Sequence, residues 1–332
     1  MSAKFNLNAI GNAIVDIIAP ASPEFITSQT QFGMNPNGMT LIDAARASEL
    51  YGLMGPATES SGGSAGNTMA AFASFGGKGA YIGKVANDKF GEVFTHDIRA
   101  LGVEFNTPVL ENSSPTAQCL ILVTPDAQRT MNTFLGACVQ LGPDDVSEEI
   151  IANSDITYLE GYLFDMPPAK AAFYKAAEIA AANGKKLALT LSDPFCVSRH
   201  RADFQHLIEN HVDILFGNED EIKALYETET FDEAAQILRG KCAVSAITRG
   251  AKGSVIMTPS ETIEVNVAKP KQILDTTGAG DAYAAGFLFG FTHGKSLKEC
   301  GELGSIAAAE VIDHYGPRPA TALKDLIPKA PA

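Results

Sequence analysis

A short turn near the end of the sequence combines an anion-binding backbone with a carboxylate. The stretch ILDTTGAGDAYAAGFLFGF places Gly278 and Gly280 just before Asp281 and a long apolar run. A helix that begins here would expose free N–H groups and the positive end of its dipole. Glycines also let a ligand approach that backbone closely. The turn therefore predicts a site for an anion such as phosphate.

The carboxylate of Asp281 is not explained by a simple phosphate cradle, because its charge would repel the anion. It is explained if Asp281 takes a proton from a hydroxyl group that attacks the phosphorus. The alternative is an ordinary aspartate that satisfies N–H groups at its own helix start. The turn lacks the Gly-Lys-Ser/Thr sequence of a Walker A loop and the glycine spacing of a dinucleotide fingerprint.

Two polar residues interrupt the apolar stretch AIGNAIVDIIA near the N-terminus. Asn12 and Asp16 are four residues apart, so on a continuous strand they would point to the same face. An ionised aspartate accepts two hydrogen bonds and an asparagine can donate, which suits a vicinal diol. The alternative is a pair of turn residues at a strand edge.

Two further stretches could contact ligands. Gly62 and Gly63 predict a flexible bend before a helix that has Asn67 in its first turn, although a plain loop would look the same. In ILFGNEDEIKAL, Asn218 and Glu221 stand where a strand passes into a helix. Oxygen ligands of this kind suit magnesium, often through water, but acidic residues are also favoured at any helix start.

Strands and helices alternate regularly in the second half of the sequence, which predicts a parallel sheet with helices on both faces. Such sheets bind ligands at the carboxyl ends of their strands. Helices are predicted at 167–186, 201–211, 219–227 and from 281 onward, and strands at 186–192, 212–217, 243–258 (two strands) and 271–275.

Short β-like runs at 117–124 and 129–135 lack this alternation and predict a separate unit. The expected fold class is therefore α/β, a doubly wound, mostly parallel sheet with a small β-rich lid. We expect the large domain to comprise 1–15, 63–102 and 135–332, and the discontinuous lid to comprise 16–62 and 103–134.

The amino-acid composition limits which classes of partner and which cellular compartment are expected. The 332 residues are 45% hydrophobic, enough for a large core, and carry a net charge of −14. That charge disfavours nucleic acid and anionic membranes as partners. Five scattered cysteines without a C-x-x-C pair suit free thiols, and the N-terminus lacks the apolar run of a signal peptide. A cytoplasmic protein is expected.

The sequence DTTGAGDAYAAGF resembles the C-terminal signature of the PfkB-type, ribokinase-like sugar and nucleoside kinases, and SGGSAGNTMAAF resembles their N-terminal signature. The resemblance extends from Asn12 to about Pro319. It implies a ribokinase-like fold, Asp281 as the general base, and an anion hole formed by the amides of Gly278, Ala279, Gly280 and Asp281.

The resemblance also implies the remaining ligand contacts. It assigns the acceptor to Asn12, Asp16, Gly62, Gly63, Asn67 and an apolar slot near Leu163; it assigns ATP to Asn218, Thr248, Gly250, Ala308 and Ile312. Glu221 would hold Mg²⁺ through water. Arg129, in the expected lid, could neutralise the transferring phosphate or could equally be an exposed arginine. Arg249 could also reach phosphate, but a surface arginine is the commoner case. Whether K⁺ is required, and whether the protein oligomerises, stays open.

Within the family, GGSAGN, YLEGYLF and VDILFGNEDE are most similar to the adenosine kinase branch. The implied reaction moves the ATP γ-phosphate to the 5′-hydroxyl of adenosine. The alternatives are a kinase for a free sugar or another nucleoside, and a nucleoside-binding sensor without activity. Because the chain has no tryptophan, the base would stack on phenylalanine or tyrosine. The candidates for the apolar slot that holds the purine are Tyr162, Leu163, Phe164 and lid aromatics such as Phe134; core packing is the alternative for each.

Overall fold

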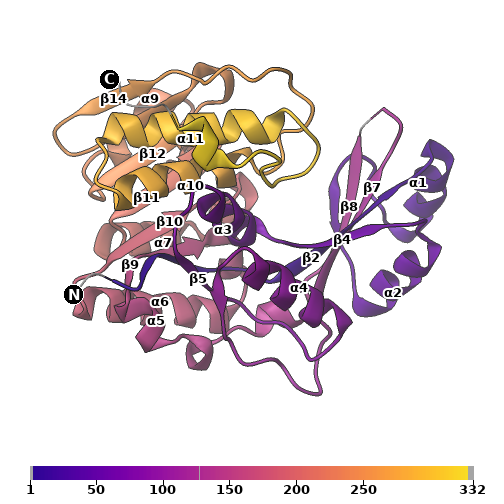
Figure 1. The fold of residues 1–332 in the computed structure, drawn as a ribbon. Helices are drawn as coiled ribbons and strands as arrows, with labels where there is room; N and C mark the ends of the chain where they lie inside the picture. The colour runs from indigo at the N-terminus through magenta and orange to yellow at the C-terminus, as the bar shows by residue number, and fades with distance from the viewer. Residues whose placement is uncertain (1–2, 127, 328–332) are drawn as a thin grey trace.

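The structure, a computed structural model, describes residues 3–126 and 128–327 and contains two separate β-sheets (Figure 1). The large sheet has nine strands. Its order is β14 (Thr262–Val265), β13 (Ser254–Met257), β12 (Val244–Thr248), β11 (Ile214–Asn218), β10 (Lys186–Thr190), β9 (Ser154–Glu160), β1 (Phe5–Ile10), β5 (Gly79–Ile82) and β6 (Glu104–Phe105). All pairings from β12 to β6 are parallel, whereas β13 pairs antiparallel with both β12 and β14.

Alternating side chains of the large sheet bury two cores, one on each face. In β10, for example, Ala188 packs on one side while Leu187 and Leu189 pack on the other. The first core lies under α3 (Ser64–Ser74), α4 (Lys89–Ala100), α10 (Ala279–Thr292) and α11 (Leu297–Ile312). The second lies under α5 (Glu148–Ala152), α6 (Pro167–Ala182), α7 (Pro194–Asn210), α8 (Glu219–Tyr226) and α9 (Phe231–Leu238). The predicted α/β fold class is therefore confirmed.

The small sheet projects from the large one, on the right in Figure 1. Its order is β3 (Met39–Leu41), β8 (Arg129–Phe134), β7 (Ala117–Val123), β2 (Ile14–Pro20) and β4 (Thr58–Gly62). A third, smaller core, built around Leu50 and Leu120, packs it against α1 (Pro23–Gln29) and α2 (Ala44–Leu53). Short 3₁₀ helices complete the chain: η1 (Thr30–Phe32), η2 (Gly136–Gln140), η3 (Pro143–Asp145), η4 (Gly161–Asp165), η5 (Gly250–Lys252) and η6 (Leu323–Leu326).

Three local predictions differ from the structure. The stretch 271–275 is not a strand: Ile273 is 70% exposed, and the Leu274 amide bonds the Ile312 carbonyl at 2.9 Å. The stretch AIGNAIVDIIA is two strands, β1 and β2, because the chain leaves the large sheet and enters the small one at Gly11–Ala13. Glu104–Phe105, expected in the lid, pairs with β5 in the large sheet.

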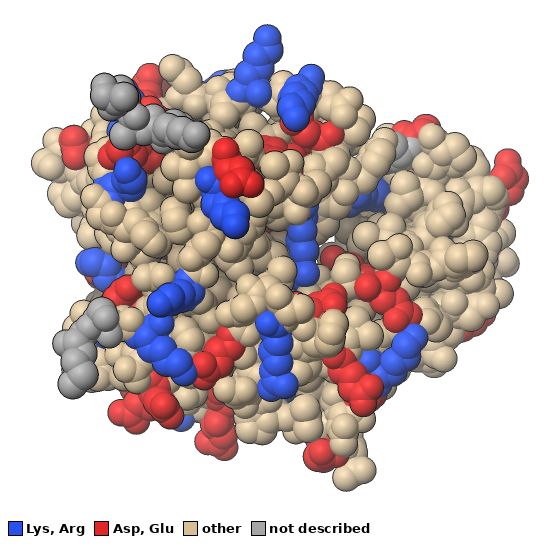
Figure 2. All heavy atoms as spheres, in the orientation of Figure 1, with Lys and Arg blue, Asp and Glu red and all other residues tan. Residues whose placement is uncertain are grey.

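The surface charge, the helices and the cysteines each relate to the binding partners and the compartment expected from the sequence. Figure 2 shows basic and acidic side chains intermixed on one face, with no continuous basic stretch among the described residues there. Within residues 3–126 and 128–327, no helix combines the length and apolar character needed to cross a bilayer. All five cysteines are free thiols.

Candidate active site

The predicted anion turn forms the start of α10. Gly278 caps the helix in the left-handed region (φ 77°), and its carbonyl accepts the Ala282 N–H at 2.8 Å. A Cβ on Gly278 would lie 2.6 Å from the Cβ of Pro317, so only glycine fits. A Cβ on Gly280 would meet no atom within 4 Å. The Ala279 N–H donates to the Thr276 carbonyl at 3.2 Å. The open space at Gly280 leaves room for an anion beside the other N–H groups of the helix start.

Asp281 lies in the first turn of α10 and is held by two residues of α3. The Ser64 hydroxyl donates to Oδ1 at 2.6 Å, and the Asn67 amide nitrogen is 3.4 Å from Oδ2. Burial raises the pKa of Asp281 to about 7, although the hydrogen bond from Ser64 lowers it. The negative charge of Glu160 raises the pKa further. No lysine or arginine of the described residues pairs with it. A carboxylate with this pKa suits a general base at neutral pH.

A small cavity of about 80 Å³ opens beside Asp281 at the carboxyl ends of β10, β11 and β12. This is the edge at which parallel α/β sheets bind ligands. The cavity is lined by Ser64, Thr190, Ser192, Phe216, Gly217, Asn218, Glu221, Ala246, Thr248, Gly280, Asp281 and Tyr283. The structure thus brings together five of the predicted residues: Asn218, Glu221, Thr248, Gly280 and Asp281.

Asn218 and Glu221 form a capping box at the start of α8. The Asn218 side chain accepts the Glu221 N–H at 2.9 Å and donates to Glu221 Oε1 at 2.6 Å. Burial raises the pKa of Glu221 to about 7, against the hydrogen bond from the Asn218 backbone. The charge of Asp281 also raises it, so the two carboxylates sense each other across the cavity.

This pair fits a divalent cation held at least partly through water. A cation between Glu221 and Asp281 would stabilise both ionised forms. Within the described residues, no group of three or more His, Cys, Asp or Glu is arranged to hold a metal directly.

Asp16 lies on β2, opposite Ser60 of β4 and Cys119 of β7. Burial raises the pKa of Asp16 to about 6, opposed by the charges of Arg318 and Arg129. A Cβ on Gly62 would lie 2.3 Å from Asp16 Oδ2, so the missing side chain makes room for this carboxylate.

Gly63 caps α3 with φ 82°, and a Cβ there would lie 2.3 Å from the Asn12 carbonyl oxygen. Both glycines of the predicted bend are therefore required where the chain returns from the small sheet. Asn67, in the first turn of α3, is buried and faces Asp281.

Asn12 does not share a face with Asp16 as predicted, because it lies in the connection between β1 and β2. Its amide nitrogen donates to Glu160 Oε1 at 2.6 Å, and Glu160 Oε2 accepts the Ala65 N–H at 2.8 Å. Burial raises the pKa of Glu160 to about 7. Glu160 thus joins two of the connections between the sheets, the one at Asn12 and the one that enters α3. The sequence reading missed it, although a lone acid ending the apolar run ITYLE was a usable signal.

Arg129 links the small sheet to the anion turn. Its Nη2 pairs with Asp275 Oδ2 at 2.5 Å, and its Nη1 is 3.5 Å from the Thr277 hydroxyl. Asp275 Oδ2 also accepts the Gly316 N–H at 2.9 Å. Asp275 therefore fixes the turn and the segment after α11 together, a role not predicted from the sequence.

The four residues suggested for holding the base differ in their exposure in the structure. Leu163 is only 2% exposed and Phe164 is buried, stacked on Phe204 with ring centroids 4.4 Å apart, so neither faces the cavity. Tyr162 is 38% exposed, and its hydroxyl donates to the carbonyl of cavity-lining Ser192 at 3.3 Å. Phe134 is partly exposed.

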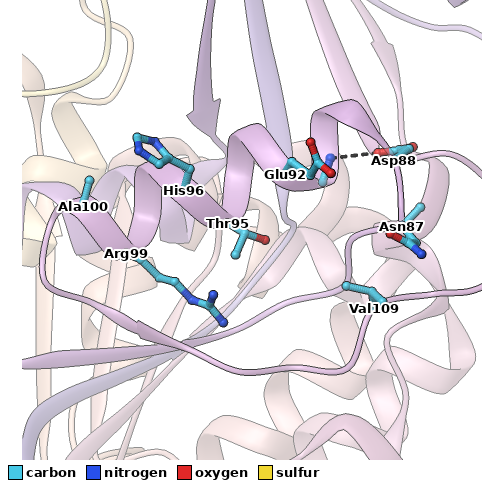
Figure 3. Close-up of a pocket in the computed structure, with 10 residues that line it drawn as sticks. Asn87, Asp88, Glu92, Thr95, His96, Arg99, Ala100 and Val109 are labelled. Atoms are coloured by element: carbon cyan, nitrogen blue, oxygen red, sulfur yellow. Dashed lines mark hydrogen bonds between the residues drawn. The ribbon is translucent and has the colours of Figure 1, made fainter.

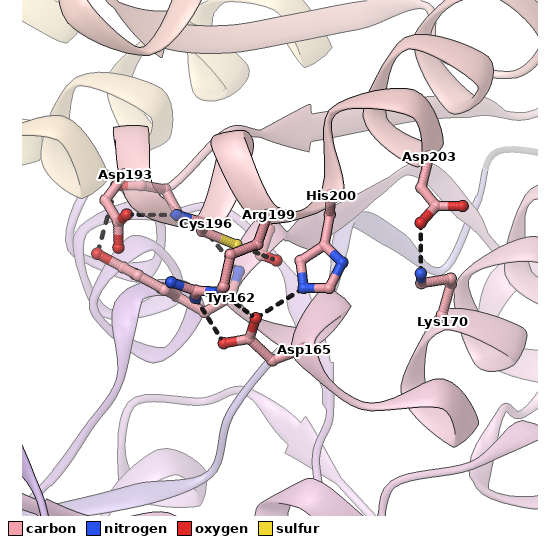
Figure 4. Close-up of polar contacts among 10 residues, drawn as sticks. Tyr162, Asp165, Lys170, Asp193, Cys196, Arg199, His200 and Asp203 are labelled. Atoms are coloured by element: carbon pink, nitrogen blue, oxygen red, sulfur yellow. Dashed lines mark hydrogen bonds and ion pairs between the residues drawn. The ribbon is translucent and has the colours of Figure 1, made fainter. Parts of the chain in front are cut away.

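Figure 4 shows Tyr162 beside a polar cluster in which Arg199 and His200 both contact Asp165. The cluster adds polar groups close to Tyr162 without adding a residue to the cavity lining.

The residues predicted for ATP lie along one side of this edge. Thr248 lines the cavity, and Gly250 (φ 55°) begins η5 with open space around it. Ala308 and Ile312, on α11, are both partly exposed and could face a base. Arg249 pairs with Glu219 at 3.0 Å and lies over the Phe231 ring, so its guanidinium is already engaged.

A larger surface hollow, about 630 Å³, lies along α4 (Figure 3). Its lining includes Asp88, Glu92, His96 and Arg99 but none of the predicted site residues. Arg99 donates to the Phe105 carbonyl and is not free to bind an anion there.

A two-sheet α/β scaffold with a carboxylate of raised pKa beside a glycine-rich helix start suits a phosphotransferase of the kinase class. The sequence pattern of the pfkB family carbohydrate kinases matches residues 38–323, and the chain belongs to this family of ATP-dependent kinases.

Three relatives extend the comparison. An adenosine kinase of Saccharomyces cerevisiae is 26% identical, over 94% of this chain and 96% of that protein. The crystal structure of adenosine kinase from Sinorhizobium meliloti is 52% identical, with a TM-score of 0.89 and 98% of each chain covered. A probable sugar kinase from Rhizobium etli is 47% identical, also with a TM-score of 0.89 and 98% of each chain covered.

Proposed function

We infer that this protein transfers the γ-phosphate of ATP to the 5′-hydroxyl of adenosine, giving AMP and ADP. The observation that carries the chemistry is Asp281, a carboxylate with a pKa near 7 in the first turn of α10, beside N–H groups that face open space. The acceptor is inferred from the relatives named as adenosine kinases, which include the 52% identical structure.

In the proposed mechanism, Asp281 accepts the proton of the 5′-hydroxyl as that oxygen attacks the γ-phosphorus. Ser64 and Asn67 hold the carboxylate in place. The amides of Gly278, Ala279, Gly280 and Asp281 donate to the phosphoryl oxygens, where negative charge develops. Arg129, delivered by the small sheet, adds a positive charge at the same turn.

The acceptor is held mainly from the small sheet. We propose that Asp16 accepts hydrogen bonds from the ribose 2′,3′-diol, with Gly62 and Gly63 leaving space for it. Asn12 acts through Glu160 rather than by direct contact. Segments 16–62 and 106–134 would then act as a lid that closes on the nucleoside and excludes water, which otherwise competes as the nucleophile.

The nucleotide occupies the other side of the turn in this proposal. Thr248 and Gly250 lie beside the phosphates and the ribose, Asn218 orients Glu221, and Ala308 and Ile312 contact the adenine. Mg²⁺, when bound near Glu221 through water, neutralises phosphate charge. This activity places the protein in the cytoplasm, where ATP and nucleosides are available.

A free-sugar acceptor is the second candidate, favoured by the 47% identity to a probable sugar kinase. The two candidates share every step at Asp281 and differ only in what fills the space beyond Asp16. A coupled assay of ADP release with adenosine, inosine, ribose and fructose tests them. Turnover with adenosine well above the others is expected, whereas turnover with sugars alone would overturn the adenosine assignment. Nucleoside binding without ADP release from any acceptor would contradict a kinase.

A further inference from the structure

The segment after α11 carries an arginine into the candidate active site. The Gly316 N–H donates to Asp275, and Pro317 packs directly against Gly278 at the start of α10. Further on, the Ala320 and Thr321 N–H groups both donate to Glu310 Oε1, at 3.1 and 2.6 Å. The segment is therefore fixed on both sides of Arg318.

The Arg318 guanidinium is buried among residues already placed in the site. Its Nε is 3.4 Å from Asn67 Oδ1, and the amide nitrogen of the same asparagine is 3.4 Å from Asp281. Its Nη2 lies over the first turn of α3, 3.9 Å from where a Cβ of Gly66 would be. The positive charge of Arg318 is close enough to Asp16 to lower the pKa of that carboxyl.

The Nη2 group has no hydrogen-bond partner among the described residues, although it is fully buried. Burial lowers the pKa of Arg318, but a guanidinium keeps its proton in proteins, so its donors stay in place. A buried donor without an acceptor is costly. A sugar hydroxyl can accept from an arginine and donate to a carboxylate at the same time, and here a guanidinium and the Asp16 carboxylate lie close together.

We propose that Arg318 binds the acceptor directly, donating from Nη2 to a ribose hydroxyl that Asp16 also holds. This inference rests on the proposed function, since it deepens the account of how the acceptor is recognised. Arg318 and Asp16 would read the cis-diol from opposite sides, and Asn67 would connect that recognition to Asp281. Arg318 is thus a specificity-determining residue for diol-bearing acceptors.

The test compares R318Q and R318K with the wild-type protein on adenosine, 2′-deoxyadenosine and 3′-deoxyadenosine. A charge-assisted hydrogen bond is worth about 1.5–3 kcal/mol, so R318Q should lower kcat/KM for adenosine by about 10- to 100-fold, mostly through KM. For the analogue that lacks the contacted hydroxyl, the loss should be threefold or less, on the order of 0.7 kcal/mol. The KM for ATP should stay unchanged.

Equal losses on all three acceptors would overturn the proposal and leave Arg318 a packing residue. No loss on adenosine would also overturn it. R318K keeps the charge but not the planar fork, so it should recover only part of the adenosine activity. Full recovery by R318K would mean that charge alone matters, again against the proposal. If R318Q does not fold, the same comparison across acceptors is made with R318K.

R201Q is the matched control, because Arg201 lies on α7 and its polar partners among the described residues are Glu227 and the Ala224 carbonyl. It should match the wild type on all acceptors. The wild-type assay separates the two ideas. If the wild type phosphorylates a sugar but not adenosine, the proposed function fails, and R318Q is tested on that sugar and its deoxy forms. If adenosine is a substrate and the losses are uniform, only the role of Arg318 fails.

Discussion

At the scale of single residues, the proposed chemistry depends on Asp281 as the proton acceptor. Replacing it with asparagine keeps the size of the side chain and an acceptor for Ser64, but removes the proton acceptor. We expect D281N to lower kcat by about 10²- to 10⁴-fold, with KM for both substrates changed much less. Steady-state kinetics on the folded variant measure this. A kcat within a few-fold of the wild-type value would rule out Asp281 as the base.

The raised pKa of Asp281 also predicts how stability depends on pH. Its folded-state pKa is about 7 and its ordinary value is 3.8, so between these the folded state binds more protons than the unfolded one. Stability from this group therefore decreases as pH rises through that window, and the full cost is present above pH 7. D281N should unfold at a higher temperature than the wild type at pH 8, and at nearly the same temperature at pH 4. The opposite order would contradict a buried, destabilised carboxylate.

For the wild type, the same pKa predicts that kcat/KM for the acceptor falls as pH decreases below about 7, because the protonated carboxyl cannot act as a base. The pKa values of Glu160 and Glu221 are also raised to about 7, and that of Asp16 to about 6. The pH profile therefore reports the combined titration of these three carboxylates and Asp281. A flat profile between pH 6 and 8 would contradict the assignment.

At the scale of elements, the bend before α3 requires glycine at position 63 for two reasons, the backbone angles there and the lack of room for a side chain. A Cβ on Gly63 would lie 2.3 Å from the Asn12 carbonyl, whereas Gly33, at a similar φ of 85°, has no atom within 4 Å. G33A should cost only about 1–2 kcal/mol of unfolding free energy, from backbone strain. G63A should cost about 3 kcal/mol or more, since its φ/ψ region is close to glycine-only and the clash adds to that.

Urea unfolding of both variants measures the difference. If G63A and G33A lower the free energy of unfolding equally, the clash with the Asn12 carbonyl adds nothing to the cost. The preference for glycine at position 63 would then come from its backbone angles alone.

The spacing of apolar residues predicted helices and strands correctly where an element packs one face against the core. Alternating runs such as 117–124 became β7, and the apolar run after Asp281 became α10. It failed at 271–275, where apolar side chains are exposed beside the ligand edge instead of pairing in a sheet. It also failed at Asn12, because sequence spacing does not show that a chain changes sheets between two strands.

At the scale of the whole molecule, Arg129 carries a charge from the small sheet to the catalytic turn of the large domain. R129M keeps an unbranched apolar stem but removes the guanidinium and its pairing with Asp275. We expect kcat to fall by about 10²-fold, as for loss of one donor to developing charge, with acceptor KM changed less. R46Q is the control, because Arg46, on α2, contacts Glu49 of the same helix and Gln29 of α1, both on the helices that pack against the small sheet. Unchanged kcat in R129M would mean that this charge does not reach the phosphate.

Contacts of this kind could not be predicted from the sequence. Arg129 and Asp275, or Arg318 and Asn67, are far apart along the chain and are joined only by how the two sheets and the segment after α11 fold together. The signature motifs located the base and the anion turn because those residues are consecutive. Glu160 and Arg318 belong to no such run. Asp275 opens the signature DTTGAGD, but its contacts with Arg129 and Gly316 are seen only in the folded structure.

Glu160 ties the start of α3 to the point where the chain enters the small sheet. Ser64 and Asn67 of the same helix start donate the two hydrogen bonds that lower the pKa of Asp281 against the effect of burial. Rotation of the small sheet would disturb those donors, and the base would then hold its proton at neutral pH. An empty, open enzyme would thus be unable to activate a stray water molecule. Wasteful ATP hydrolysis, measured as ADP release without acceptor, should accordingly be slow and should increase little as pH rises toward 7.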